Sequence, residues 1–199
     1  MKIYHNSEDL EGVRIGFVMT GSFCTFAQAF AQAEYLVSCG AELIPVMSWN
    51  ASEISTRFGT AAEQCERLEN IANRKIIRTI EDAEPIGPKN MTDVMLVEPC
   101  TSNTAAKLAL SITDSPATMA VKSHLRGQKP VVLAIASNDS LAGSMKHLGL
   151  LFHTKYYYFV PIRQDDPEKK PSSLVADFSR TTDTIRSALQ GKQLQPVLI

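Results

Sequence analysis

Apolar residues occur in short continuous runs along this chain, and helical patterns lie between the runs. The runs predict buried strands over 13–19, 41–47, 94–97 and 131–135. Apolar positions spaced by three and four predict helices over about 26–37, 60–72, 103–112 and 116–126. Apolar strands that alternate with helices are typical of a parallel sheet with helices on both faces. The sequence therefore predicts the α/β class.

The second half of the chain has a less regular pattern. We expect a helix over 141–148 and a strand over 156–162, and Pro85, Gly87 and Pro88 predict a loop over 79–92. The charged segment 164–171 is interpreted as a linker or a lid. A last helix is predicted with one apolar face, made of Leu174, Phe178, Ile185 and Leu189. The chain is thus predicted to be one domain, 1–199, with a core over about 12–162 and a lid-like loop and C-terminal helix over 163–199.

Small polar residues follow each of the main predicted strands. The strand ends contain Thr20-Gly21-Ser22, Ser48-Trp49-Asn50, Thr101-Ser102-Asn103 and Ala136-Ser137-Asn138. The carboxyl ends of parallel strands lie at one edge of a sheet, where such folds bind ligands. A strand, a polar turn and then a helix also present N–H groups and hydroxyls to an anion. We therefore expect a polar cofactor tail or phosphate at this edge.

Several other kinds of site have little support in the sequence. The first strand is not followed by G-x-G-x-x-G, and no G-x-S-x-G or H-E-x-x-H is present. Taken alone, Thr20-Gly21-Ser22 is also compatible with a helix cap, and Ser48 with a turn. The run 156–159 is interpreted as a packed strand, with stacking on an aromatic cofactor as the alternative. We predict no metal site and assign no catalytic residue.

Composition limits the partners of the chain. It has 199 residues, a net charge of −1 and 44% hydrophobic residues, so it lacks the positive charge that nucleic acids attract. The N-terminal residues lack the pattern of a signal peptide, and no apolar run reaches the ~20 residues needed to span a bilayer. Four widely spaced cysteines favour reduced thiols in the cytoplasm.

The segment 99–109, Pro-Cys-Thr-Ser-Asn-Thr-Ala-Ala-Lys-Leu-Ala, with Ile112-Thr113-Asp114 after it, resembles the signature of the flavoprotein family. That family includes flavin-containing cysteine decarboxylases and flavin prenyltransferases, and the resemblance covers about residues 12–162. It implies a Rossmann-like parallel sheet, bound FMN, and a homo-oligomer such as a trimer or dodecamer. It also implies that Gly21, Ser22 and Ser48 contact the phosphate. The residues implied to contact the phosphate, ribityl chain or ring edge are Thr101, Ser102, Asn103 and Thr104.

The chain departs from the decarboxylases of this family in two places. No histidine lies between His5 and His124, although these decarboxylases carry a histidine several residues before the central strand. Their Pro-Ala-Met-Asn loop corresponds here to Ile-Ala-Ser-Asn, 135–138, which keeps only Ala136 and Asn138. Both departures argue against peptidyl-cysteine or phosphopantothenoylcysteine decarboxylation.

The tail, over 165–178 and 193–196, resembles a branch of the family that acts in sporulating bacteria. That resemblance implies a cytoplasmic role in the mother cell, with a separate A subunit that is similar to an NAD(P)-dependent dehydrogenase. The implied reaction oxidises dihydrodipicolinate to dipicolinate. Its dicarboxylate substrate requires cations and N–H groups, for which Lys107, Asn138 and Lys146 are candidates. Lys169 and Lys170 are added if 164–171 closes as a lid, with a solvated surface as the alternative.

Two further functions stay open at this point. The chain could act alone as an FMN-dependent decarboxylase or prenyltransferase. Alternatively, it could be a non-catalytic partner that keeps the flavin fold and supplies only shape or stability to the A subunit.

Overall fold

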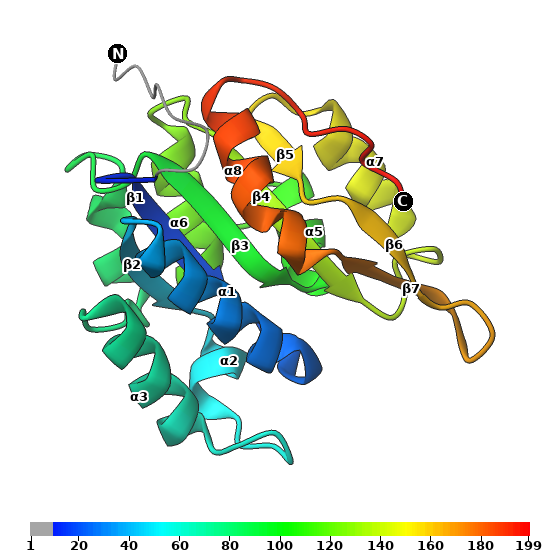
Figure 1. Ribbon diagram of the computed structural model, residues 1–199, viewed down its shortest axis with the longest axis horizontal. Coiled ribbons are helices and arrows are strands. Elements are labelled where there is room, and N and C mark those ends of the chain that lie inside the picture. Colours follow the sequence, from blue (N-terminus) through cyan, green and yellow to red (C-terminus); the bar gives the residue numbers. More distant parts are fainter. Residues whose placement is uncertain (1–9) are drawn as a thin grey trace.

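The computed structural model describes residues 10–199 and contains a seven-stranded sheet (Figure 1). The strands are β1 (Arg14–Met19), β2 (Glu42–Met47), β3 (Val94–Cys100), β4 (Val131–Ser137), β5 (Tyr157–Phe159), β6 (Ile162–Asp166) and β7 (Lys170–Ala176). The α-helices are α1 (Phe26–Ser38), α2 (Trp49–Glu53), α3 (Ala61–Ala72), α4 (Ile80–Ala83), α5 (Ser102–Ala109), α6 (Pro116–Leu125), α7 (Met145–His153) and α8 (Thr181–Leu189). Short 3₁₀ turns are η1 (Phe23–Thr25), η2 (Glu84–Ile86) and η3 (Phe178–Arg180).

The first five strands form the parallel part of the sheet. They are paired in the order β2-β1-β3-β4-β5, and the register places Gly16 of β1 between Ile44 of β2 and Met95 of β3. A Cβ atom at position 16 would lie 2.4 Å from the sulfur of the buried Met95 side chain, so a larger residue here would force that side chain to move. This arrangement confirms the predicted α/β class. It also places the carboxyl ends of β1, β2, β3 and β4 at one edge.

Helices cover both faces of the parallel strands (Figure 1). On one face, Phe30 of α1 and Ile185 of α8 pack with Phe17 of β1 in a single apolar cluster. On the other face, Val121 of α6 and Leu151 of α7 join a second cluster that includes α5. The strands are buried between these two clusters, so both of their faces contact apolar side chains. Their sequences are therefore continuously apolar and do not alternate between apolar and polar residues. In the part of the chain that the structure describes, no helix combines the length and apolarity needed to cross a membrane.

Several elements of the second half differ from the predictions. The helix expected over 141–148 begins later, at Met145, and continues to His153. The strand expected over 156–162 pairs with β4 only over Tyr157–Phe159. The segment 79–92, predicted as a loop, contains α4 and η2, because Thr79 caps a short helix by accepting a hydrogen bond from the Asp82 N–H at 3.1 Å.

The largest correction concerns the tail, which forms a β-hairpin and not a lid-like loop. Strands β6 and β7 pair antiparallel, and β7 also pairs with the end of β4 through Ala136↔Val175. Asp166 accepts hydrogen bonds from the N–H groups of Glu168 and Lys169, at 3.2 and 3.0 Å, which fixes the turn between the strands. Leu174, predicted on a helix, therefore lies in β7, and the last helix begins at Thr181.

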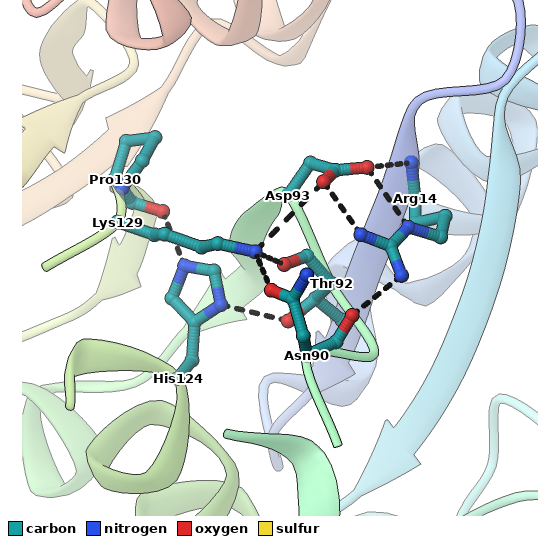
Figure 2. Close-up of polar contacts among 7 residues, drawn as sticks. All are labelled: Arg14, Asn90, Thr92, Asp93, His124, Lys129 and Pro130. Atoms are coloured by element: carbon teal, nitrogen blue, oxygen red, sulfur yellow. Dashed lines mark hydrogen bonds and ion pairs between the residues drawn. The ribbon is translucent and has the colours of Figure 1, made fainter. Parts of the chain in front are cut away.

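A polar network joins the amino ends of β1, β3 and β4, opposite the edge where the strands end (Figure 2). Arg14 forms an ion pair with Asp93 at 2.7 Å, and Lys129 lies 3.8 Å from the same carboxylate. Burial by itself raises the pKa of Asp93. The hydrogen bonds from Arg14 lower this pKa by more than burial raises it, so the net shift is downward. The network thus holds three strand starts together.

His124 completes this network and is almost fully buried. Its Nε2 lies 2.9 Å from the carbonyl oxygen of Pro130, which can only accept, so Nε2 carries the proton. Nδ1 then accepts a hydrogen bond from the Thr92 hydroxyl at 2.7 Å. Burial lowers the pKa of His124 to about 4, so the ring is neutral at pH 7. The histidine has a structural role.

The low pKa of His124 predicts a pH-dependent contribution to stability. Unfolded histidine takes up a proton near pH ~6.5, whereas the folded ring stays neutral down to about pH 4. This contribution is therefore present above pH ~6.5 and is lost as the pH falls towards 4, by up to about 3 kcal/mol. Denaturant unfolding of wild type and His124→Gln at several pH values measures it. The difference between the two should shrink at acid pH, and a constant difference would contradict the prediction.

Candidate functional site

The hydroxyl of Thr20 joins the carboxyl ends of β1 and β3. Thr20 is buried, and its Oγ1 donates a hydrogen bond to the Pro99 carbonyl oxygen at 2.7 Å. The same oxygen accepts a hydrogen bond from the Thr101 N–H at 3.0 Å. These two bonds fix the start of the turn after β3 against the turn after β1. Consequently Gly21 and Ser22 lie beside Thr101.

Thr101 is also the N-cap of α5, which begins at this edge. Its Oγ1 accepts a hydrogen bond from the Thr104 N–H at 3.3 Å, and it donates to the Thr104 hydroxyl at 3.1 Å. The amino end of α5 carries a partial positive charge from its unpaired N–H groups. The predicted strand–turn–helix arrangement is therefore present, with this end of α5 at the site.

Asp139, which follows β4, accepts hydrogen bonds from three serine hydroxyls. Ser102 and Ser137 donate to Oδ1 at 2.5 and 2.6 Å, and Ser144 donates to Oδ2 at 2.7 Å. The bonds from Ser102, then Ser137 and Ser144, lower the pKa of Asp139. A serine has only one hydroxyl proton, and Ser102 and Ser137 each donate theirs to Asp139. Towards a ligand they can therefore only accept hydrogen bonds, through their lone pairs. They are suited to ligand hydroxyls and N–H groups, more than to a phosphate.

A cleft of about 1130 Å³ lies at this edge of the sheet. Its walls come from the turn after β1 and from η1, the turn at 57–58, the ends of β3 and β4, the β6–β7 hairpin and η3. The hairpin is thus a wall of the cleft and part of the sheet. The polar and charged residues of the lining are Ser22, Cys24, Thr25, Gln28, Gln32, Arg57, Thr101, Ser102, Ser137, Asn138, Arg163, Asp165, Lys170, Ser173, Asp177 and Ser179.

The cleft brings together five of the residues predicted from the sequence. They come from three different strand ends: Gly21, Ser22, Thr101, Ser102 and Asn138. The structure also places Lys170 in the lining, although on a strand and not on a lid.

The other predicted residues are not in the lining of this cleft. Ser48 caps α2, where its Oγ accepts a hydrogen bond from the Ala51 N–H at 3.3 Å. Thr104 is buried and bonded to Thr101, and Asn103 is exposed on α5. Lys107 points to Asp114, with an ion pair of 2.9 Å, and Lys146 is exposed on α7. The roles inferred for these five residues stay predictions.

Sequence reasoning missed three residues that shape this edge: Asp139, Arg57 and Arg163. Asp139 directly follows Asn138, so the polar strand end could have been extended by one residue. Arg57 and Arg163 lie in segments with no recognisable motif, and only the fold brings them to one cleft.

Glu98 lies at the end of β3, immediately before the turn at the site. It is completely buried; Oε2 accepts a hydrogen bond from the Thr181 hydroxyl at 2.7 Å, and Oε1 has no partner among residues 10–199. Burial raises the pKa of Glu98 to about 8, so the carboxyl is mostly protonated at pH 7. Glu98 therefore links β3 to the start of α8 as a neutral acid.

Comparison with known proteins identifies the class to which this fold and site belong. Residues 3–164 match the family model described as Flavoprotein. The match covers most of the chain, and the chain belongs to this family.

Individual relatives are similar over nearly the whole chain. The B subunit of dipicolinate synthase from Bacillus subtilis (strain 168) is 45% identical over 190 residues, which cover 96% of this chain and 95% of the relative. The crystal structure of the same B subunit from Bacillus halodurans C superposes with a TM-score of 0.88 at 40% identity, covering 96% of this chain and 98% of that one. Burkholderia xenovorans DmrB in complex with FMN shares the fold, with a TM-score of 0.67 at 19% identity over 89% of this chain and 96% of that one.

The Asp139 cluster gives a first prediction for this edge. In Asp139→Asn, one carboxylate oxygen becomes an NH₂ group, so at least one serine hydroxyl loses its acceptor. We expect the free energy of unfolding at pH 7 to fall by about 1–2 kcal/mol in urea titrations. The control is Asp165→Asn, which breaks only the exposed ion pair with Lys170 and should change stability by less than about 0.5 kcal/mol. Equal effects of the two substitutions would contradict this account.

The buried carboxyl of Glu98 gives a second prediction. Unfolded glutamate loses its proton near pH 4.5, whereas folded Glu98 keeps it up to about pH 8. The stabilising contribution of the retained proton is present below pH 4.5 and is lost as the pH rises to 8. Glu98→Gln keeps a neutral group of the same shape. The melting temperature of Glu98→Gln should therefore rise relative to that of wild type between pH 5 and pH 8.5. Parallel pH profiles of the two proteins would refute the raised pKa of Glu98.

Proposed function

We propose that this chain is the flavin-binding component of an enzyme that oxidises dihydrodipicolinate to dipicolinate. One observation carries the proposal. The 45% identity to the Bacillus subtilis relative extends over 96% of this chain, whereas the family match ends at residue 164. The similarity therefore includes the β6–β7 hairpin, which forms a wall of the cleft.

The cleft has the size and the chemistry to accept FMN. Its volume of about 1130 Å³ is at the upper end of ordinary ligand pockets, which reach ~1,000 Å³. Ser22 and the amino end of α5 at Thr101 would hold the phosphate, because both offer donors that are not held by Asp139. Ser102 and Ser137 would accept hydrogen bonds from the ribityl hydroxyls. When bound, a flavin supplies an acceptor for the hydride that leaves a dihydropyridine ring.

The residues of this chain would bind and orient the reactants. The floor of the cleft is rigid because Thr20 and Asp139 fix the turns after β1, β3 and β4 to one another. Rigid placement of two reactants is itself a large contribution to rate. The final acceptor in our proposal is a nicotinamide cofactor on a separate A subunit.

Assembly of several copies is part of this proposal. Five large apolar residues are exposed on or just after α5 and on α7: Leu110, Ile112, Met145, Leu150 and Phe152. The helices α5 and α7 pack against each other, so these residues lie on neighbouring elements. Exposed apolar residues on adjacent helices support contacts between copies.

The alternative of a decarboxylase that acts alone has weaker support. In the decarboxylases of this family a histidine serves the reaction, and the cleft lining within residues 10–199 contains none. A non-catalytic partner that supplies only shape or stability is the second alternative. Flavin binding by the chain, together with its effect on the rate of the A subunit, separates that alternative from the proposal.

The test is to purify the chain, its A subunit and their mixture, and to measure bound flavin and dihydrodipicolinate oxidation. We expect the chain to bind FMN and the mixture to be at least tenfold faster than the A subunit alone. Thr101→Val should weaken FMN binding about tenfold, because it removes the hydroxyl that caps the amino end of α5 and so holds its N–H groups in place at the cleft. Thr79→Val removes the corresponding cap of α4 outside the cleft and should leave FMN binding unchanged. Full activity of the A subunit alone would refute the proposal.

A further inference from the structure

The charges in the cleft do not balance. Its lining contains three cationic residues, Arg57, Arg163 and Lys170, and two carboxylates, Asp165 and Asp177. The whole chain, in contrast, has a net charge of −1. The excess positive charge is thus a local property of this cleft, and it favours an anionic ligand.

Three of these five groups are already paired. Lys170 forms an ion pair with Asp165 at 2.6 Å. Asp177 accepts hydrogen bonds from the backbone N–H and the hydroxyl of Ser179, at 3.2 and 2.6 Å. Arg57 and Arg163 have no acidic partner within residues 10–199. The two arginines therefore provide the unpaired positive charge of the cleft.

Arg57 is held by a short turn at one side of the cleft, the cyan loop after α2 in Figure 1. Thr56 and Gly59 exchange backbone hydrogen bonds of 3.0 and 3.1 Å, and the Gln64 side chain donates to the Phe58 carbonyl oxygen at 2.8 Å. The Arg57 guanidinium carbon lies 4.8 Å from the centroid of the Phe58 ring. Stacking on the ring limits the motion of the guanidinium and leaves its N–H edges available for an anion.

Arg163 approaches the same cleft from the β6–β7 hairpin. It is paired with Val175, which is paired in turn with Ala136 of β4. Directly paired residues of antiparallel strands share a face of the sheet, and all three line the cleft. The hairpin thus fixes Arg163 on the cleft side of the sheet.

We propose that Arg57 and Arg163 bind the two carboxylates of the substrate. This inference rests on the proposed function, because it names how the same cleft recognises a pyridine-type dicarboxylate. Each guanidinium offers a planar pair of N–H donors that matches one carboxylate. Arg57 comes from the turn at 57–58 and Arg163 from the β6–β7 hairpin, which are separate walls of the cleft, so a ligand with two carboxylates could engage both arginines, and a monocarboxylate only one. The pair replaces Lys107 and Lys146, which lie outside the lining.

The experiment measures binding of two ring acids to the full-length, FMN-saturated chain by calorimetry. Dipicolinate has two carboxylates, and picolinate is the same ring with one. We expect wild type to bind dipicolinate at least tenfold more tightly than picolinate. Arg57→Gln and Arg163→Gln should each weaken dipicolinate binding about tenfold and reduce the preference between the acids.

Arg67→Gln is the matched control. Arg67 is also exposed, lies 4.6 Å from the centroid of the Phe30 ring and pairs with Glu34, but it is outside the cleft lining. This variant should bind both acids as wild type does. Arg57→Lys keeps the charge but loses the planar pair of donors, so its affinity for dipicolinate should lie between those of wild type and Arg57→Gln.

The inference fails if wild type binds the two acids equally, if it binds neither, or if Arg57→Gln and Arg163→Gln bind dipicolinate as wild type does. These results are independent of turnover. Selective dipicolinate binding with no stimulation of dihydrodipicolinate oxidation would instead count against the proposed function and leave the binding role of the arginines intact.

Discussion

The arrangement of the candidate site depends on the hydrogen bonds of one buried hydroxyl, which join the turns that follow β1 and β3. Thr20 directly follows β1, and its Oγ1 both donates to the Pro99 carbonyl oxygen and accepts from the Thr101 N–H. A buried hydroxyl with both partners is stable, whereas the same backbone groups without partners would each cost about 1–3 kcal/mol. The turn after β3 and the amino end of α5 are therefore held beside Gly21 and Ser22. Without this junction, the strand ends would be neighbours but would not form one surface.

The two ends of the sheet use polar residues for different purposes. At the amino end, Asp93 bonds to Arg14, Lys129 bonds to Asn90 and the Thr92 carbonyl oxygen, and His124 bonds to Thr92 and Pro130, so these side chains stabilise strand starts (Figure 2). At the carboxyl end, Asp139 accepts from three serines, and part of each lining serine faces an open cleft. The partners explain the difference: the charged groups at the amino end are bonded within the protein, whereas the serines at the carboxyl end line an open cleft and keep lone pairs for a ligand.

The sequence predicted the parallel half of the fold because its signals are local. Each strand of that half is a continuous apolar run, and helices such as α3 begin at a capping threonine, Thr60. The attachment of the hairpin to the sheet could not be predicted because it is not local: Val175 of β7 pairs with Ala136 of β4. A charged segment with a proline predicts a loop, and here only its turn, at 167–169, fits that expectation.

The candidate site was predicted in part for the same reason. Strand ends are readable from the sequence, so Gly21, Ser22, Thr101, Ser102 and Asn138 could be named and do line one cleft. Arg57 and Arg163 could not, because neither follows a parallel strand and each depends on a turn or hairpin for its direction. The role inferred for Lys107 stays a prediction; in the structure this residue is outside the cleft lining and forms an ion pair with Asp114.

The central claim is that the carboxyl edge of the sheet binds a flavin in the cleft beside Ser22 and Thr101. A crystal structure of the full-length chain grown with saturating FMN tests it most directly. The account predicts the flavin in this cleft, with its phosphate bonded to Ser22 or to the amino end of α5. A structure with the cleft free of flavin, or with FMN bound on another surface, would contradict it.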